Sequence, residues 1–287
     1  MKQLTFIKRS NGNHWVGDGF PVQSIFSYND VAGELSPFLL MDYAGPATFP
    51  PTTRKLGVGE HPHRGFETVT IVYEGGVTHR DSSGGGGTIG PGDVQWMTAA
   101  AGVVHEEFHS ADFARRGGVF EMVQLWVNLP ARHKMSAPGY QGIADAQIPR
   151  VELPGDVGTV RVIAGGYDTA KGAARTFTPM NVWDLRLKAG RSLSFELFDG
   201  HTAALFVLHG AIQIGAHAVR SAELAVVERE GTQLAFDTAE DSVVLLLSGQ
   251  PLDEPIVGYG PFVMNSRDEI MQAMRDFESG NFGQIAR

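Results

Sequence analysis

The stretch HPHRGFETVTIVYEGG, residues 61–76, gives the clearest indication of the fold of this chain. Its part from Phe66 to Glu74 is rich in Phe, Thr, Val, Ile and Tyr, which favour β-strands, and two glycines then mark a turn. Similar short runs recur through the first half at 75–81, 92–99, 102–110 and 119–129. This spacing predicts a sandwich or barrel of short strands rather than alternating strands and helices.

The second half repeats this pattern. Strand-like runs occupy 159–166, 182–190, 191–200, 202–215, 222–230, 232–237 and 242–249. Since 287 residues are about twice a typical domain, we expect two all-β domains, 1–131 and 155–287, joined by a turn-rich linker at 132–154. One helix is expected near the C-terminus, where Ser266 and Glu269 form a capping-box pair before Ile270, Met274 and Phe277.

Composition excludes several classes of protein. The chain has no cysteine, so a disulfide framework, a zinc ribbon, an iron–sulfur cluster and a thiol nucleophile are all ruled out, and any metal must be bound by nitrogen and oxygen. The glycine run 84–87 lacks the Lys-Ser/Thr of a phosphate loop, so we interpret it as a flexible hairpin connection.

The charge and the apolar pattern bear on location and partners. The first residues lack the apolar core of a secretory signal, and no run is long enough for a membrane helix, so we expect a soluble cytoplasmic protein without membrane contact. The net charge of -9, without a cluster of Lys or Arg, argues against direct binding of nucleic acid.

Two pairs of side chains have the spacing of metal ligands. Residues two apart in a strand share a face and lie roughly 7 Å apart, so His61 and His63 can reach one ion, as can His105 and Glu107. Neighbouring strands would bring both pairs to one point inside a barrel. Pro62 cannot donate to a sheet ladder, so the first pair should lie at the start of a strand or at a bulge.

The spacing leaves alternatives open. Glu67 has the position of a metal carboxylate as well as Glu107 does, whereas Glu106 should point to the other face of its strand. His79 and His109 lie near the motif and are candidates to support the ligands, although such residues are more often structural. The remaining histidines have no partner at ligand spacing and are expected to be non-functional: His14, His133, His201, His209 and His217.

The chain resembles the pirin family of the cupin superfamily. The matching blocks are HPHRGFETVT, EGG, PGDVQWMTA, GVVHEE, QLWVNLP and GPFVMNS, at 61–70, 74–76, 91–99, 102–107, 124–130 and 260–266. The resemblance implies two tandem cupin jelly-roll barrels. It also implies an Fe(II) ion held in the first barrel by His61, His63, His105 and Glu107, with Glu67 beside the site rather than bound to the ion.

The second half is expected to lack a metal site. The turn at Gly75 has its counterpart at Gly210, 135 residues later. By this offset His61, His63 and His105 correspond to Glu196, Phe198 and Glu240. Because these residues do not repeat the histidine pattern, we expect the second barrel to have a structural role, bracing the first barrel.

The resemblance also suggests a reaction. Some pirins are similar to quercetinases, which open a flavonol ring with O₂ and release carbon monoxide. The hypothesis for this chain has Glu107 remove the proton of the flavonol 3-hydroxyl, while Phe38, Met41 and Trp96 line an apolar mouth or are simply core. Mixed nitrogen and oxygen ligands also suit Mn, Co, Ni or Cu, and four ligands leave two positions of six open.

Two other functions keep the same fold. One is an iron-dependent regulatory pirin that binds a protein partner and catalyses no reaction. The other is a sugar-binding or isomerase cupin without redox chemistry.

Overall fold

The computed structural model describes residues 1–10 and 12–286, which form two compact units. One unit, the first barrel, contains residues 12–32, 38–145 and 253–286. The other, the second barrel, contains residues 1–10, 33–37 and 146–252. The expected class, two jelly-roll β-barrels with a short C-terminal helix, is confirmed.

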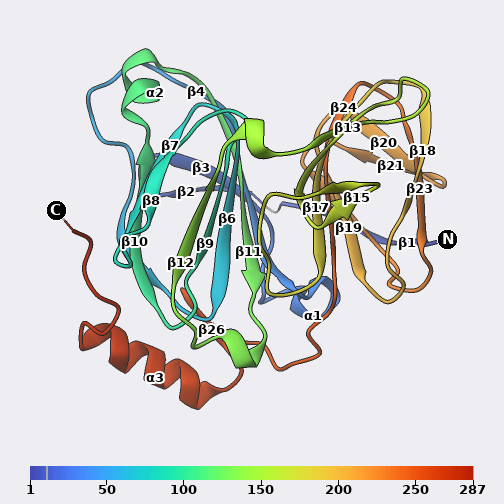
Figure 1. The fold of residues 1–287 in the computed structure, drawn as a ribbon. Coiled ribbons are helices and arrows are strands. Elements are labelled where there is room, and N and C mark those ends of the chain that lie inside the picture. Colours follow the sequence, from blue (N-terminus) through green and yellow to red (C-terminus); the bar gives the residue numbers. More distant parts are fainter. Residues whose placement is uncertain (11, 287) are drawn as a thin grey trace. The chain divides into compact units, whose positions relative to one another are not determined.

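Two antiparallel sheets form the first barrel (Figure 1). An apolar core lies between them. The core contains Phe20, Val22, Phe120 and Met122 from the larger sheet and Val77 from the smaller one. The larger sheet has the order β12 (Gly139–Ile143), β9 (Val94–Thr98), β6 (Phe66–Glu74), β11 (Gly118–Asn128), β4 (Phe38–Phe49), β3 (Phe20–Phe26), β2 (Asn13–Val16). The smaller sheet has the order β5 (Gly57–His63), β10 (Val103–His109), β7 (Val77–Asp81), β8 (Gly86–Ile89), and β25 (Val257–Tyr259) pairs with β26 (Phe262–Met264).

The second barrel is built in the same way. Its larger sheet has the order β1 (Leu4–Arg9), β22 (Glu223–Val227), β19 (Thr202–His209), β24 (Ser242–Gly249), β17 (Met180–Leu187), β14 (Gly158–Ala164), β13 (Arg150–Glu152). Its smaller sheet has the order β18 (Arg191–Glu196), β23 (Gln233–Thr238), β20 (Ala211–Ile214), β21 (His217–Arg220), and the short strands β15 (Gly166–Tyr167) and β16 (Ala170–Lys171) form a separate pair.

The strand orders of the two barrels correspond position by position. Equivalent strands can therefore be compared with the expected offset of 135 residues between the two halves. Gly75 follows β6 and Gly210 follows β19, the equivalent strand. The offset places Glu196 on β18, where it pairs with Gln233, but both side chains are exposed, whereas His61 and His105 face the barrel interior. The inward-facing pair next to them is Phe195 with Leu234, so the second barrel has apolar side chains at this level. The expectation of Glu240 was wrong, because the chain between Gly210 and β23 is shorter than the chain between Gly75 and β10.

The compact units do not follow the expected ranges 1–131, 132–154 and 155–287. The N-terminal strand β1 pairs with β22 of the second barrel, and residues 253–286 belong to the first barrel. Strand β12, inside the expected linker, pairs with β9 of the first barrel. Each of these strands adds to the edge of a sheet, and the local sequence does not indicate which edge a strand will join.

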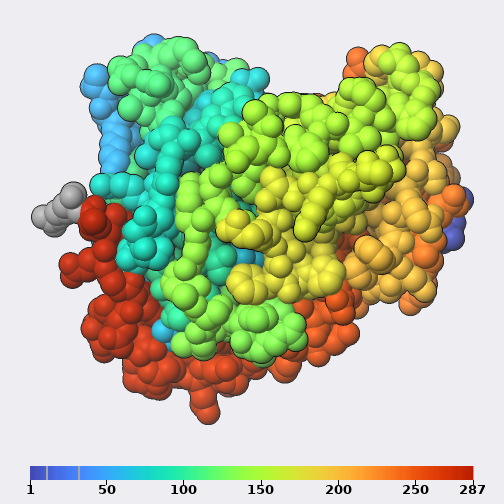
Figure 2. Space-filling view, viewed as in Figure 1, coloured from blue at the N-terminus to red at the C-terminus, as the bar shows by residue number. Residues whose placement is uncertain are grey.

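The C-terminal helix α3 (Arg267–Glu278) has the predicted cap, since the Ser266 hydroxyl accepts a hydrogen bond from the Glu269 amide. Ile270 and Ala273 of α3 are buried in an apolar cluster with Val104 of β10. The red C-terminal segment lies against cyan residues of the first barrel in the space-filling view (Figure 2).

The other helices are short. They are α1 (Ala32–Leu35), α2 (Ala111–Arg116) and the 3-10 turns η1 (Ala131–His133) and η2 (Asp145–Gln147). The sequence analysis did not predict α2. Among the described residues, no helix has both the length and the apolar character needed to cross a membrane.

Replacement of Ile270 by Ala tests whether α3 braces the first barrel. The side chain is 6% exposed within the apolar cluster, so we expect the free energy of unfolding to fall by about 2–4 kcal/mol in urea titrations. Met271→Ala is the matched control, because Met271 is 51% exposed on the same helix, and it should change the free energy by less than about 0.5 kcal/mol. Equal effects of the two variants would contradict this role of α3.

Candidate metal centre

Strand β10 lies between β5 and β7 and carries both His105 and Glu107. Its register places His105 opposite His61 of β5 and opposite Asp81 of β7. The register between β10 and β5 shifts between His105 and Glu107, on the side of His61 away from Pro62, and Pro62 itself pairs with Val104. The first pair therefore lies next to a bulge, one of the two expected settings, but at the end of β5 rather than at its start. His61 and His105 therefore meet across neighbouring strands.

The side chain of Glu106 points to the opposite face of β10, as the sequence predicted. Its carboxylate accepts hydrogen bonds from Lys55 Nζ at 3.2 Å and from Arg80 Nε at 2.9 Å. Glu107 is 3% exposed and contacts buried polar side chains of the barrel instead. The alternation of a strand thus separates these two adjacent carboxylates.

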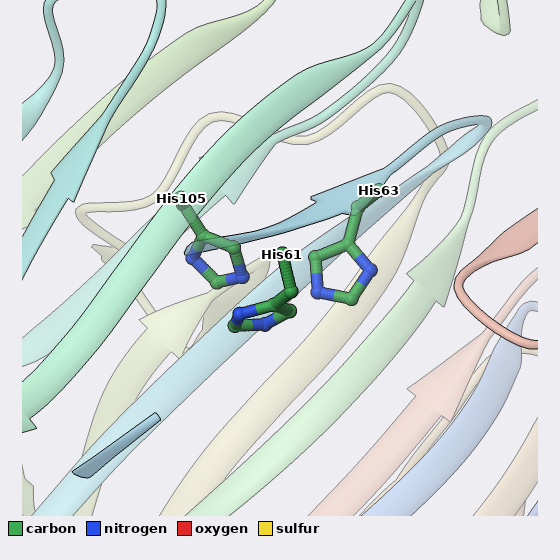
Figure 3. A group of neighbouring side chains, drawn as sticks. All are labelled: His61, His63 and His105. Carbon is green, nitrogen blue, oxygen red and sulfur yellow. The ribbon is translucent and has the colours of Figure 1, made fainter. Parts of the chain in front are cut away.

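The three predicted histidines are brought together. Their ring centroids lie 5.0 Å apart for His61 and His63, 4.2 Å for His61 and His105, and 4.8 Å for His63 and His105. One ring nitrogen from each lies within 4.8 Å of one from each of the others. Figure 3 shows the three rings gathered at one place.

Backbone carbonyls set the proton positions of two of these rings. His61 Nδ1 lies 2.8 Å from the Gly59 oxygen, and His63 Nδ1 lies 3.4 Å from the Pro261 oxygen. A carbonyl oxygen only accepts, so both rings donate through Nδ1. Each Nε2 then carries a lone pair, as a metal ligand requires.

The third ring, His105, contains an unpartnered nitrogen. Its Nδ1 lies 3.2 Å from His79 Nδ1, whereas its Nε2 is buried and has no hydrogen-bond partner among the described residues. Burial, together with the neighbouring histidines, lowers the pKa of His63 and of His105 well below the usual value. Both rings are therefore neutral at pH 7, and the orphaned nitrogen fits a metal cation.

Glu107 is held by an amide and hydroxyl network. Its Oε1 accepts from Gln95 Nε2, and its Oε2 accepts from Gln124 Nε2 at 3.2 Å. The Thr70 hydroxyl donates to Gln124 Oε1 at 2.6 Å and lies 3.4 Å from Glu107 Oε1. These contacts fix the orientation of the carboxylate.

Glu107 belongs to a second group of possible ligands. It lies within 4.8 Å of His79 and His105, so the two groups share His105. The described residues contain no other group of this kind, and both groups lie in the first barrel.

Glu67 is not part of either group. It is 1% exposed, and its Oε1 accepts from Thr98 Oγ1 at 2.7 Å. Along β6, Thr70 faces the barrel interior, so Glu67, three residues earlier, faces the other side of the sheet. The expectation that Glu67 supports the ligands is therefore wrong.

The other histidines divide as follows. His79 contacts His105 directly, so it stays a candidate to support the proposed ligands. His109 donates to the Gly19 oxygen at 2.8 Å and packs against Phe49 and Phe120, so it is structural. The remaining histidines take no part in either ligand group: His14, His133, His201, His209 and His217.

Several residues of the site were missed by the sequence analysis. Thr70, Gln95 and Gln124 are polar residues that each lie between two buried apolar neighbours in a strand, and this placement was the available signal. Asp81 lies two residues after His79 on β7, so the spacing that marked the ligands was also a signal for this contact. No local signal marks Tyr140, whose ring reaches His79 from a distant strand.

A cavity of about 320 Å³ adjoins the site and is lined by His61, His63 and Glu107. This volume is at the low end of the range for small-molecule pockets. Its other lining residues are mostly apolar: Val16, Phe20, Val22, Asp42, Ala44, Val58, Met122, Gln124 and Trp126. Phe38, Met41 and Trp96 do not line this cavity and are fully buried, which agrees with their alternative assignment as core.

Two parts of the chain match known protein families. The Pirin family matches residues 19–127, and the Pirin C-terminal cupin domain matches residues 182–283. A Pseudomonas aeruginosa protein provisionally named quercetin 2,3-dioxygenase is 57% identical over 282 residues, which cover 98% of this chain and 99% of that protein.

The chain is also similar to a solved bacterial structure and to a mouse protein. The crystal structure of a quercetin 2,3-dioxygenase from Acinetobacter baumannii superposes with a TM-score of 0.96 at 55% identity, and all of both chains is covered. Pirin of Mus musculus is 38% identical over 258 residues, which cover 87% of this chain and 83% of that protein.

Replacing both His61 and His63 by Ala should abolish metal binding. Elemental analysis of purified wild type should find about one metal ion per chain, and the double variant should hold less than about a tenth of that amount. The control replaces two exposed histidines, His14 and His217, by Ala and should retain the wild-type metal content. Full metal content in the His61/His63 variant would exclude the proposed ligands.

Glu67 should make stability depend on pH. Burial raises the pKa of Glu67 from 4.5 to about 7. The Glu67 carboxyl loses its proton at a lower pH in the unfolded chain than in the folded one. The free energy of unfolding therefore falls as pH rises from about 4.5 through 7. The shift corresponds to roughly 3 kcal/mol.

Glu67→Gln removes this titration. Between pH 5 and pH 8, urea unfolding of metal-free protein should show the stability of wild type falling relative to that of the variant. Parallel pH profiles for the two proteins would contradict the assignment.

Proposed function

Because the chain belongs to the pirin family, we propose that its first barrel is a metal-dependent dioxygenase that opens a flavonol such as quercetin with O₂ and releases carbon monoxide. The observation that carries this proposal is the group of three histidines with inward lone pairs beside a mostly apolar cavity. The names of two similar proteins, from Pseudomonas aeruginosa and Acinetobacter baumannii, support the choice of substrate.

The proposed ligands are His61, His63, His105 and Glu107. Three neutral imidazoles and a carboxylate suit Fe(II), our first choice, and also suit Mn, Co, Ni or Cu. A bound ion of this kind supplies a Lewis acid and, for a redox metal, a route for electrons to O₂. The fourth ligand is the least constrained, since Glu107 shares a group with His105 but not with His61 or His63.

Glu107 is the proposed general base. It lines the cavity, where it can accept the proton of the flavonol 3-hydroxyl, and loss of this proton makes the ring electron-rich enough to react with O₂. Gln95 and Gln124 hold the carboxylate from two sides, so it does not need to reorient when the substrate arrives.

The walls of the cavity suit a flat aromatic ligand. Phe20, Val22 and Met122 provide apolar surface, and Trp126 packs edge-on against His63 at 5.2 Å between ring centroids. Such walls exclude water from the reacting atoms. Asp42 is the one carboxylate in this lining besides Glu107, and it accepts a hydrogen bond from Ser24 at 2.6 Å.

A second candidate is a metal-dependent, protein-binding role without turnover. The similarity to mouse pirin favours it. Both candidates use the same metal site, and both are proposed for the cytoplasm without direct contact with nucleic acid. Release of carbon monoxide from a flavonol distinguishes them, because the protein-binding role needs no chemistry.

Aerobic incubation of iron-loaded protein with quercetin tests the dioxygenase proposal. We expect loss of the flavonol absorption with evolution of carbon monoxide. Glu107→Gln should lower turnover by roughly 10²-fold or more, since a general base contributes about 10²–10⁴. Metal content is measured in the same samples to separate loss of the base from loss of the ion.

Glu106→Gln is the matched control. It changes the adjacent carboxylate on the outer face of the same strand and should keep turnover within about twofold of wild type. Absence of carbon monoxide from metal-loaded wild type would reject the dioxygenase and leave the protein-binding role. Full activity of Glu107→Gln would reject Glu107 as the base.

A further inference from the structure

The hairpin of β7 and β8 carries two buried polar side chains that the proposed reaction does not use. His79 and Asp81 lie two residues apart on β7, and both side chains are 0% exposed. Asp81 pairs with His105 in the sheet, and His79 pairs with Glu107. Both therefore lie beside the proposed ligands.

The hydrogen bond between Asp81 and His79 determines which nitrogen of His79 carries a proton. Asp81 Oδ2 lies 3.0 Å from His79 Nε2. An ionised carboxylate can only accept, so His79 carries its proton on Nε2. Burial acts to raise the pKa of Asp81, but hydrogen bonds from His79, Ser83 and Gly85 outweigh burial and lower this pKa, so Asp81 is ionised at pH 7.

The hydrogen bond between His79 and His105 then determines which nitrogen of His105 carries a proton. A neutral His79 with its proton on Nε2 has only a lone pair on Nδ1. His79 Nδ1 lies 3.2 Å from His105 Nδ1, so His105 must be the donor. Its proton is then on Nδ1, and Nε2, the nitrogen without a partner among the described residues, presents a lone pair.

The opposite arrangement leaves an unsatisfied donor. If His79 donated from both nitrogens, His105 would accept on Nδ1 and carry its proton on Nε2. That N–H would be buried without an acceptor in the described part of the chain, which costs about 1–3 kcal/mol. The arrangement that satisfies every donor is the one that prepares His105 for a metal.

We propose that the hydrogen-bonded chain from Asp81 through His79 to His105 positions the proton of His105, so that the β7–β8 hairpin is part of the metal centre. This inference rests on the proposed metal site of the first barrel. It assigns Asp81 and His79 as positioning residues. It also explains why His79 is not itself a ligand, since both of its nitrogens are occupied.

The turn after β7 holds Asp81 in a single orientation. Asp81 Oδ1 accepts from the Ser83 amide at 2.8 Å, the Ser83 hydroxyl at 2.6 Å and the Gly85 amide at 3.0 Å. A Cβ at Gly85 would lie 2.5 Å from Asp81 Oδ2 and 2.7 Å from the Cβ of Tyr140, so this position requires glycine. Of the glycine run, Gly84 and Gly85 lie in this turn, whereas Gly86 and Gly87 begin β8.

The ring of Tyr140 in β12 stacks on the imidazole of His79 and limits its rotation. The two rings stack at 5.1 Å between centroids with an interplanar angle of 15°. The strand expected to be a linker therefore contributes to the metal centre.

Asp81→Asn gives a sharp test, because the turn determines how the new amide lies. The three donors from Ser83 and Gly85 keep the amide oxygen at the position of Oδ1, so the NH₂ group must face His79 Nε2. His79 then accepts on Nε2 and donates from Nδ1. His105 accepts on Nδ1, and its proton moves to Nε2, into the ligand site.

Two measurements detect the move of the His105 proton from Nδ1 to Nε2. Nitrogen-15 NMR of histidine-labelled, metal-free protein identifies the protonated nitrogen of His105, with its signals assigned by their absence in His105→Asn. Competition titration gives the affinity for Fe(II). We expect Nδ1–H in wild type, Nε2–H in Asp81→Asn, and affinity lower by about 10–100-fold in the variant.

Asp93→Asn is the matched control. Asp93 also closes a turn of the first barrel, and its oxygens accept from the Gly90 and Asp145 amides at 2.9 and 2.8 Å. It has no contact with a histidine in the described structure, so affinity and the His105 proton should stay as in wild type. A general loss of stability from removing a turn carboxylate would affect both variants.

The outcomes separate this inference from the proposed function. Nε2–H in wild-type His105 overturns the inference, and this result needs no variant to fold. An unchanged proton position with an affinity within about twofold of wild type in Asp81→Asn also overturns it. If wild type shows the expected proton and the variant the reversed one, but neither protein binds metal, the positioning chain stands and the metal site is rejected.

Discussion

The structure of the site depends on the pairing of β10 with β5 on one side and β7 on the other. This register sets His105 between His61 and Asp81 and sets Glu107 opposite His79. A slip of one residue would turn every side chain of β10 to the other face, so that Glu106 would enter the barrel and both proposed ligands would leave it. The apolar cluster between α3 and Val104 helps to hold β10 in this register.

The sequence predicted the grouping of three histidines because strand geometry is local. Residues two apart share one face of a strand, and this rule correctly brought His61, His63 and His105 together and turned Glu106 away. The rule did not predict that Gln95 and Gln124 contact Glu107, because these contacts join distant strands. The carbonyl of Pro261 reaches His63 from the C-terminal segment in the same way.

The two barrels share a strand order but differ in what fills them. The interior of the second barrel is packed with apolar side chains, among them Leu193, Phe195 and Leu234 of its smaller sheet. The corresponding sheet of the first barrel carries histidines and carboxylates at its inward positions. Fold alone therefore does not specify a metal site, whereas a network of satisfied hydrogen bonds around inward lone pairs does.

The proposed metal site is tested most directly by anomalous X-ray diffraction at the iron edge from crystals of iron-loaded protein. We expect a single anomalous peak at about 2.1 Å from Nε2 of His61, His63 and His105, with a Glu107 oxygen also bound. A peak bonded to His79, or no peak among the three histidines, would contradict it.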